Sequence, residues 1–164
     1  MPWTRRRSRA ASARRSFRSS VCGVDAASSF AVIKTKRWND PVEADDGYRL
    51  LVCRFRPRGV RQADETWNAW LPQLGPSPEL HAAVYGKSGP PIPWDEYAAR
   101  YVKEMQAQSY WIRGFAERAR NETITLLCSS ACVDPARCHR TLLRALMEER
   151  PREDAPARVI RRRT

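Results

Sequence analysis

Three cysteines, a histidine and an arginine lie close together near the carboxyl end of the chain: Cys128, Cys132, Cys138, His139 and Arg140. A thiol beside an imidazole and a guanidinium has a lowered pKa and more of the nucleophilic thiolate. We therefore predict an enzyme pocket in which Cys138 or Cys128 is the nucleophile and His139 the base or acid. Arg140 would be the anion clamp, because a guanidinium binds phosphate or carboxylate in a bidentate fork.

The sequence around these residues predicts a strand, a short loop and a helix. Residues 124–127 form a short apolar run with the β-branched side chains of a buried strand. Asp134 is expected to cap the helix and Pro135 to occupy its first position. The helix should run to about Arg150, since Pro151 cannot continue it. At such a junction the carboxyl end of a parallel strand meets the start of a helix, and the free backbone N–H groups of the helix can bind an anionic ligand.

Further basic residues follow the other predicted strands. Residues 30–34 read as a first strand that is followed by Lys36 and Arg37, and residues 48–55 as a second that is followed by Arg58. If all three strands are parallel, these side chains and Arg140 converge on one rim and form an anion-binding pocket. The alternative is that the basic residues pair in solvent with acids of residues 38–47, a predicted surface loop. Those acids are Asp40, Glu43, Asp45 and Asp46.

Other interpretations of the thiols remain open. Zinc could bind Cys128, Cys132, Cys138 and His139, but the C-x3-C-x5-C-H spacing lacks the usual paired knuckles, so we predict no metal and no cofactor. Cys128 and Cys138 could also meet as a redox pair across the junction. A third alternative is inert packing of small apolar thiols, with His139 bonded to a backbone carbonyl.

The remaining elements complete an α/β fold. A short helix is predicted over residues 65–71, Ser77 is expected to cap a turn, and residues 111–120 continue a helical region. A long helix opens at Pro93 and carries an aromatic stripe that should face the core. The stripe consists of Trp94, Tyr97, Ala98, Tyr101, Val102 and Met105. We expect one compact domain with a small, mostly parallel sheet flanked by helices.

Charge divides the chain into three parts. The net charge of the 164 residues is +12, of which residues 1–24 carry +7 and residues 150–164 carry +4, so the remainder is nearly neutral. We predict a disordered basic extension over 1–28, the α/β domain over 29–150 and a disordered basic tail over 151–164. Nucleic acid would bind through these tails only; otherwise we expect a small anionic ligand. The sequence does not indicate an oligomeric state.

Two features predict a cytoplasmic protein. The sequence has no run of roughly 20 apolar residues, the length that a membrane-spanning helix needs. It holds five cysteines, an odd number, without the apolar segment of a secretory signal, which favours a reducing compartment over disulfide bonding.

The motifs also resemble a known family. The run Leu126-Leu127-Cys128, then Asp134-Pro135 and Cys138-His139-Arg140-x-x-Leu143, is similar to the signature of domain of unknown function 488. The resemblance spans about residues 30–149 and implies a compact α/β domain without implying an activity. Two departures are Arg56, where the branch has tryptophan, and the extra thiol Cys132 in a longer loop. Upstream stretches resemble its YeaO-like branch in order: Lys36-Arg37, Asp46-Gly47-Tyr48-Arg49-Leu50-Leu51-Val52, Pro57-Arg58-Gly59, Trp70, Pro76-Ser77-x-x-Leu80 and Tyr97-x-x-x-Tyr101.

Overall fold

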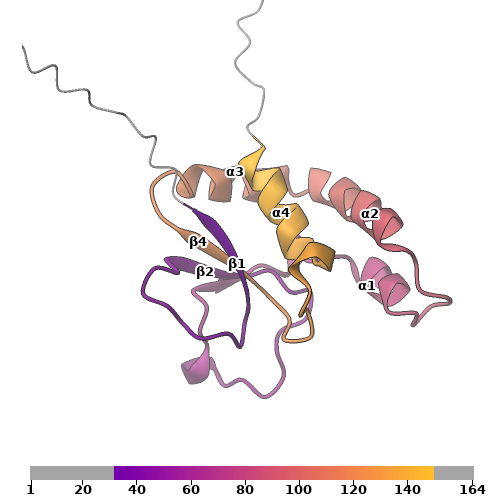
Figure 1. The fold of residues 1–164 in the computed structure, drawn as a ribbon, viewed down its shortest axis with the longest axis horizontal. Coiled ribbons are helices and arrows are strands. Elements are labelled where there is room, and N and C mark those ends of the chain that lie inside the picture. The colour runs from indigo at the N-terminus through magenta and orange to yellow at the C-terminus, as the bar shows by residue number, and fades with distance from the viewer. Residues whose placement is uncertain (1–31, 150–164) are drawn as a thin grey trace, which may run out of the picture.

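A computed structural model describes residues 32–149 and contains one sheet of four parallel strands (Figure 1). The strands are β1 (Ile33–Arg37), β2 (Tyr48–Leu51), β3 (Ala69–Trp70) and β4 (Ile124–Cys128). Their order in the sheet is β1-β4-β2-β3. The α/β class and the parallel sheet predicted from the sequence are confirmed. The basic segments 1–28 and 151–164 lie outside the described residues, as do Phe30 and Ala31 of the predicted first strand.

β4 is one of the two inner strands of the sheet. All five of its residues are buried, as expected for a parallel strand that is covered on both faces. It pairs with β1 from Ile33 opposite Ile124 to Arg37 opposite Cys128, and with β2 on its other side. The carboxyl end of β4 therefore lies in the middle of the sheet edge, beside the ends of β1 and β2.

Four α-helices cover one face of the sheet (Figure 1). They are α1 (Pro78–Val84), α2 (Trp94–Gln106), α3 (Ser109–Arg118) and α4 (His139–Glu148). Leu50 and Leu126 point into this layer, where they join the predicted stripe residues Tyr97, Tyr101 and Met105 in the main core. Ser77 caps α1 as predicted, because its hydroxyl accepts the Leu80 N–H at 3.1 Å.

Loops cover the opposite face. Side chains alternate along a strand, so Leu51 and Leu127 point away from the helices. They contact a second, smaller core that includes Trp67, with Trp38 and Val60 packed against it. The sheet is thus closed on both faces, although helices cover only one of them.

The loop from β1 to β2 contains a buried acid that its sequence does not suggest. The Asp46 side chain is 2% exposed and forms ion pairs with Lys36, at 2.6 Å, and with Arg49. The next residue, Gly47, has a φ of +59°, and a Cβ atom there would lie 2.1 Å from the Thr123 carbonyl oxygen. Glycine therefore allows this loop to return close against the residue that precedes β4.

The predicted boundaries of the first two strands and one helix were wrong. β1 begins at Ile33, so Lys36 and Arg37 lie within the strand, and β2 ends at Leu51 instead of residue 55. The helix predicted over 65–71 is replaced by a 3-10 helix (Gln62–Asp64) and by the edge strand β3. Pairing with β2 makes this segment a strand and not a helix. The Asn68 N–H donates to the Arg49 carbonyl and the Asn68 side-chain oxygen accepts the Arg49 N–H, both at 2.8 Å.

The predicted start of the last helix was also wrong. Pro135–Arg137 form a 3-10 helix, and Cys138 is extended, with φ −135° and ψ 136°, before α4 begins at His139. The extended residue directs the thiol back toward β4, which a continuous helix from Pro135 would not do. Within residues 32–149, no helix is long and apolar enough to span a membrane.

Candidate functional site

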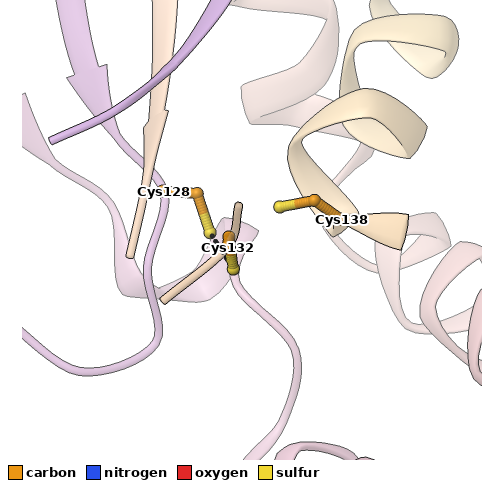
Figure 2. Close-up of side chains that lie close together, drawn as sticks. All are labelled: Cys128, Cys132 and Cys138. Atoms are coloured by element: carbon orange, nitrogen blue, oxygen red, sulfur yellow. Dashed lines mark hydrogen bonds between the residues drawn. The ribbon is translucent and has the colours of Figure 1, made fainter. Parts of the chain in front are cut away.

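Three thiols meet at the carboxyl end of β4 (Figure 2). Cys128 ends the strand, Cys132 lies in the following loop and Cys138 immediately precedes α4. Their sulfur atoms all lie within 4.8 Å of one another, and the Cys128 and Cys132 sulfur atoms are 3.3 Å apart. We call these three residues the thiol trio. Cys128 and Cys138 are buried, whereas Cys132 is half-buried.

Hydrogen bonding within the thiol trio favours a thiolate on Cys132. Hydrogen bonds from Cys128 and then from Cys138 lower the pKa of the Cys132 thiol, and the nearby charge of Arg140 adds to the effect. The same hydrogen bonds raise the pKa values of the Cys128 and Cys138 thiols. Of the three sulfur atoms, the most exposed one, on Cys132, is therefore the one on which a thiolate is favoured, and the Cys128 thiol donates to it at 3.3 Å.

His139 lies behind the thiol trio in a single tautomer. Its Nε2 is 2.9 Å from the Val52 carbonyl oxygen, which can only accept, so Nε2 carries the proton. Nδ1 then has the lone pair of the ring, and the Cys128 sulfur atom lies 3.8 Å from both ring nitrogen atoms. Burial lowers the pKa of the imidazole, which is consequently neutral near neutral pH. The structure thus brings the predicted pair Cys128 and His139 together.

A cavity of about 320 Å³ opens in front of the thiol trio. Its walls come from the segment after β2, from α1, from the start of α2 and from the β4–α4 connection. It is lined by Cys53, Arg54, Phe55, Pro76, His81, Val84, Tyr85, Ile92, Trp94, Tyr97, Cys128, Ser129, Cys132, Arg137, Cys138 and His139. Within residues 32–149, two arginines and no aspartate or glutamate contribute to this lining, so the field within the cavity favours anions.

The predicted anion rim has a different arrangement. Lys36 pairs with Glu43 and Asp46, Arg37 pairs with Asp40 at 2.7 Å, and Arg58 is exposed. None of these three lines the cavity. Pairing with acids of the β1–β2 loop is the alternative that the sequence also allowed. The anion-binding role of these three residues stays a prediction.

Arg140 is buried beside the thiol trio instead of at the rim of the cavity. It is 4% exposed and donates from Nη2 to the Cys132 carbonyl at 3.3 Å. Its Nε and Nη1 atoms have no hydrogen-bond partner within residues 32–149. A buried guanidinium with so few partners is best balanced by a nearby negative charge, such as a thiolate on Cys132.

Asp134 accepts the Ala136 N–H at 2.9 Å. It therefore acts as a cap, but for the 3-10 helix and not for α4. This capped turn places Arg137 at the cavity wall, one residue before Cys138.

The thiol trio also has the soft sulfur ligands that thiophilic metal ions prefer. The His139 ring lies outside the group of mutually close ligand atoms, so the four-ligand zinc arrangement considered from the sequence is not assembled in this geometry. One hydrogen bond, from Cys128 to Cys132, joins two of the thiols, and Cys138 completes the group by proximity.

Several residues of this site could not be singled out from the sequence. Cys132 was noted only as an extra thiol and as one possible zinc ligand, although its place between Cys128 and Cys138 was a usable signal. Arg54, His81 and Tyr85 come from segments far from β4 in the sequence, and no local pattern marks them. Their contribution depends on how α1 packs at the end of the sheet.

Comparison with protein families identifies the chain. The family model described as the active DUF488-N3 subclade matches residues 33–151. The chain belongs to this family. The resemblance inferred from the strand and Cys-His-Arg motifs is therefore confirmed, and the matched region contains the thiol trio.

Curated relatives belong to the same group of proteins. The DUF488 chain is 33% identical to the uncharacterised protein YeaO of Escherichia coli K12 over 98 residues, which cover 60% of this chain and 83% of YeaO. It is also 33% identical to the uncharacterised protein Rv3073c of Mycobacterium tuberculosis over 73 residues, or 44% of this chain and 59% of the relative. No solved structure matches the chain.

Proposed function

We propose that this DUF488 protein is an enzyme that binds an anionic substrate in the cavity, with Cys132 as its nucleophile. One observation carries the proposal: three thiols, two of them hydrogen-bonded, lie at the wall of a cavity to which residues 32–149 contribute two arginines and no acid. The description of the subclade as active supports an enzyme. Phosphate- and carboxylate-bearing compounds are the substrate class.

The nucleophile is Cys132 instead of the Cys138 or Cys128 favoured by the sequence. All three thiols line the cavity, but Cys128 and Cys138 are only 1% and 2% exposed, whereas the half-buried Cys132 is the most accessible of them. The hydrogen bonds from both buried thiols lower the pKa of Cys132, which supports thiolate at neutral pH. In this assignment Cys128 and Cys138 are positioning residues for the thiolate.

His139 is a positioning residue behind the thiol trio. Its Nε2–H donates to the Val52 carbonyl, both ring nitrogen atoms lie 3.8 Å from the Cys128 sulfur, and burial lowers its pKa, so it packs beside Cys128 as a neutral ring. The anion-binding groups are Arg54 and Arg137 in the cavity wall, and the buried charge of Arg140 stabilises the thiolate from behind. This retains the Cys-His-Arg chemistry predicted from the sequence, with a different division of roles.

Alkylation of the full-length chain tests the proposal. Iodoacetamide would be added at neutral pH with and without inorganic phosphate, and modified cysteines located by mass spectrometry. We expect Cys132 to react before Cys53, another cavity thiol, and phosphate to slow its modification several-fold. Arg137→Gln should abolish this protection, whereas Arg120→Gln, a surface change beside Glu117, should retain it. Slow modification of Cys132, or rates that are insensitive to phosphate, would overturn the assignment.

A further inference from the structure

The mouth of the cavity carries exposed aromatic side chains. Phe55 and Tyr85 are 58% and 53% exposed, and both line the cavity. His81 lies between them, with its ring centroid 5.2 Å from that of Phe55 and 4.8 Å from that of Tyr85. Neither Phe55 nor Tyr85 belongs to a core cluster, so fold stability does not explain their positions. We call Phe55, His81 and Tyr85 the aromatic mouth.

The inner wall of the cavity is aromatic as well. Trp94 and Tyr97 stack with ring centroids 5.3 Å apart and an interplanar angle of 27°. Tyr97 is buried in the core and Trp94 is half-buried against it. The stacked Tyr97 ring therefore holds the Trp94 indole in place. Aromatic groups from three segments, after β2, on α1 and at the start of α2, therefore surround one cavity.

The histidine of the aromatic mouth acts as a ring and not as a cation. Burial, and then the charge of Lys87, lower the pKa of the His81 imidazole, so it is neutral at neutral pH. The fixed positive charges in the cavity wall are those of Arg54 and Arg137. Arg54 precedes Phe55 in the chain, and Arg137 precedes Cys138. Two cationic groups from separate segments therefore line a cavity that several aromatic rings also line.

We propose that the cavity binds an anion carried on a planar aromatic ring, with the size of a nucleoside monophosphate. The ring lies between the aromatic mouth and Trp94, and the anionic group lies at Arg137 in front of the thiol trio. A cavity of about 320 Å³ is at the lower end of the range of ligand pockets, which limits the ligand to about one such unit. This inference rests on the proposed function for the anion and adds the class of molecule that carries it.

Three probes separate the ring from the anion. Adenosine 5′-monophosphate has both, ribose 5-phosphate has only the anion, and adenosine has only the ring. Isothermal titration of the full-length chain should show adenosine 5′-monophosphate binding at least about tenfold more tightly than either partial probe, given the usual contribution of stacking on an aromatic side chain.

Variants of exposed residues test the same point without threatening the fold. Tyr85→Ala should weaken adenosine 5′-monophosphate roughly tenfold and leave ribose 5-phosphate unchanged. Tyr110→Ala is the matched control, because Tyr110 is 74% exposed on α3 and does not line the cavity. It should leave both affinities unchanged.

Each outcome decides the inference. Equal affinity for adenosine 5′-monophosphate and ribose 5-phosphate would refute the claim that the cavity recognises the ring, while binding of the anion would still be supported. Equal affinity for adenosine and adenosine 5′-monophosphate would overturn the role of the anion. No binding of adenosine 5′-monophosphate would overturn the inference as a whole. In that case the phosphate protection of Cys132 still decides the proposed function separately.

Discussion

Replacing Asp46 by asparagine should strongly destabilise the fold. The carboxylate is 2% exposed and contacts Lys36 and Arg49, whose side chains are 15% and 5% exposed. Asp46→Asn keeps the size of the side chain but leaves two buried cations without this counterion. Breaking a buried ion pair costs about 3–5 kcal/mol. We expect about 3 kcal/mol, the lower end of that range, because Lys36 keeps its second pair with Glu43 at 2.8 Å.

The neighbouring acid provides a matched control. Asp45 is the same residue type and pairs with Lys34 at 2.6 Å, but its side chain is 75% exposed. Exposed ion pairs contribute little, so Asp45→Asn should leave the unfolding midpoint close to that of the wild type. Equilibrium unfolding in urea, followed by far-UV circular dichroism of the full-length chain, measures both free energies of unfolding.

The effect should also depend on pH with a definite sign. Burial alone would raise the pKa of the Asp46 carboxyl, but hydrogen bonds from Lys36, the Glu43 amide and Arg49 lower it below its usual value. A carboxyl with a depressed folded-state pKa stabilises the fold above its unfolded pKa, about 3.9. The difference between wild type and Asp46→Asn should therefore be constant above about pH 5 and shrink as the pH falls below about 4.

Equal effects of the two substitutions would refute this reasoning. The argument depends on burial, since both acids lie equally close to a lysine. If Asp46→Asn shifted the midpoint no more than Asp45→Asn, the ion pair in the loop would be solvated and the loop less tightly closed. A difference that persisted undiminished at pH 3 would show that the charge of Asp46 is not its source.

Three further predictions concern the site and the core. The rate of Cys132 alkylation should rise much less from pH 5 to pH 8 than that of a free thiol, which accelerates about 800-fold, because hydrogen bonds from its neighbouring thiols lower the pKa of Cys132. Mass spectrometry measures the rates, and a rise as steep as that of a free thiol would contradict this. Gly47→Ala should cost more than about 1 kcal/mol in urea unfolding, because Cβ would strike the Thr123 carbonyl. Tyr101→Phe should cost about 1–3 kcal/mol, because it leaves the buried Leu74 carbonyl without its 2.7 Å donor; an unchanged midpoint would argue against this bond.

The sequence was sufficient to predict those elements whose signal is local and periodic. The apolar run of β4, the aromatic stripe of α2 and the Ser77 cap each follow from a few neighbouring residues, and the structure has them as expected, except that Val102 of the stripe is exposed. β3 was missed because a two-residue edge strand is decided by its pairing with β2, not by its own composition. The break at Cys138 was missed because Asp134 and Pro135 begin a helix equally well whether it is α or 3-10.

The same distinction applies to the site. Cys128 and His139 could be predicted to meet because one strand, one loop and one turn connect them. The aromatic mouth could not be predicted, since Phe55 and Tyr85 reach the cavity from segments whose packing no local pattern specifies. Likewise, Asp46 was expected in a solvated loop, and its burial depends on how that loop folds against β1 and β4.

The position of β4 in the sheet has a consequence for synthesis on the ribosome. Within residues 32–149, β1 has β4 as its strand partner, and β4 is made last of the four strands. At ordinary translation speeds the ribosome needs roughly 5–20 s to pass from residue 37 to residue 128. During this interval the nascent β1 has no neighbour to pair with. Lys34 and Lys36 alternate along it, and charged side chains of this kind discourage a waiting strand from pairing with another chain.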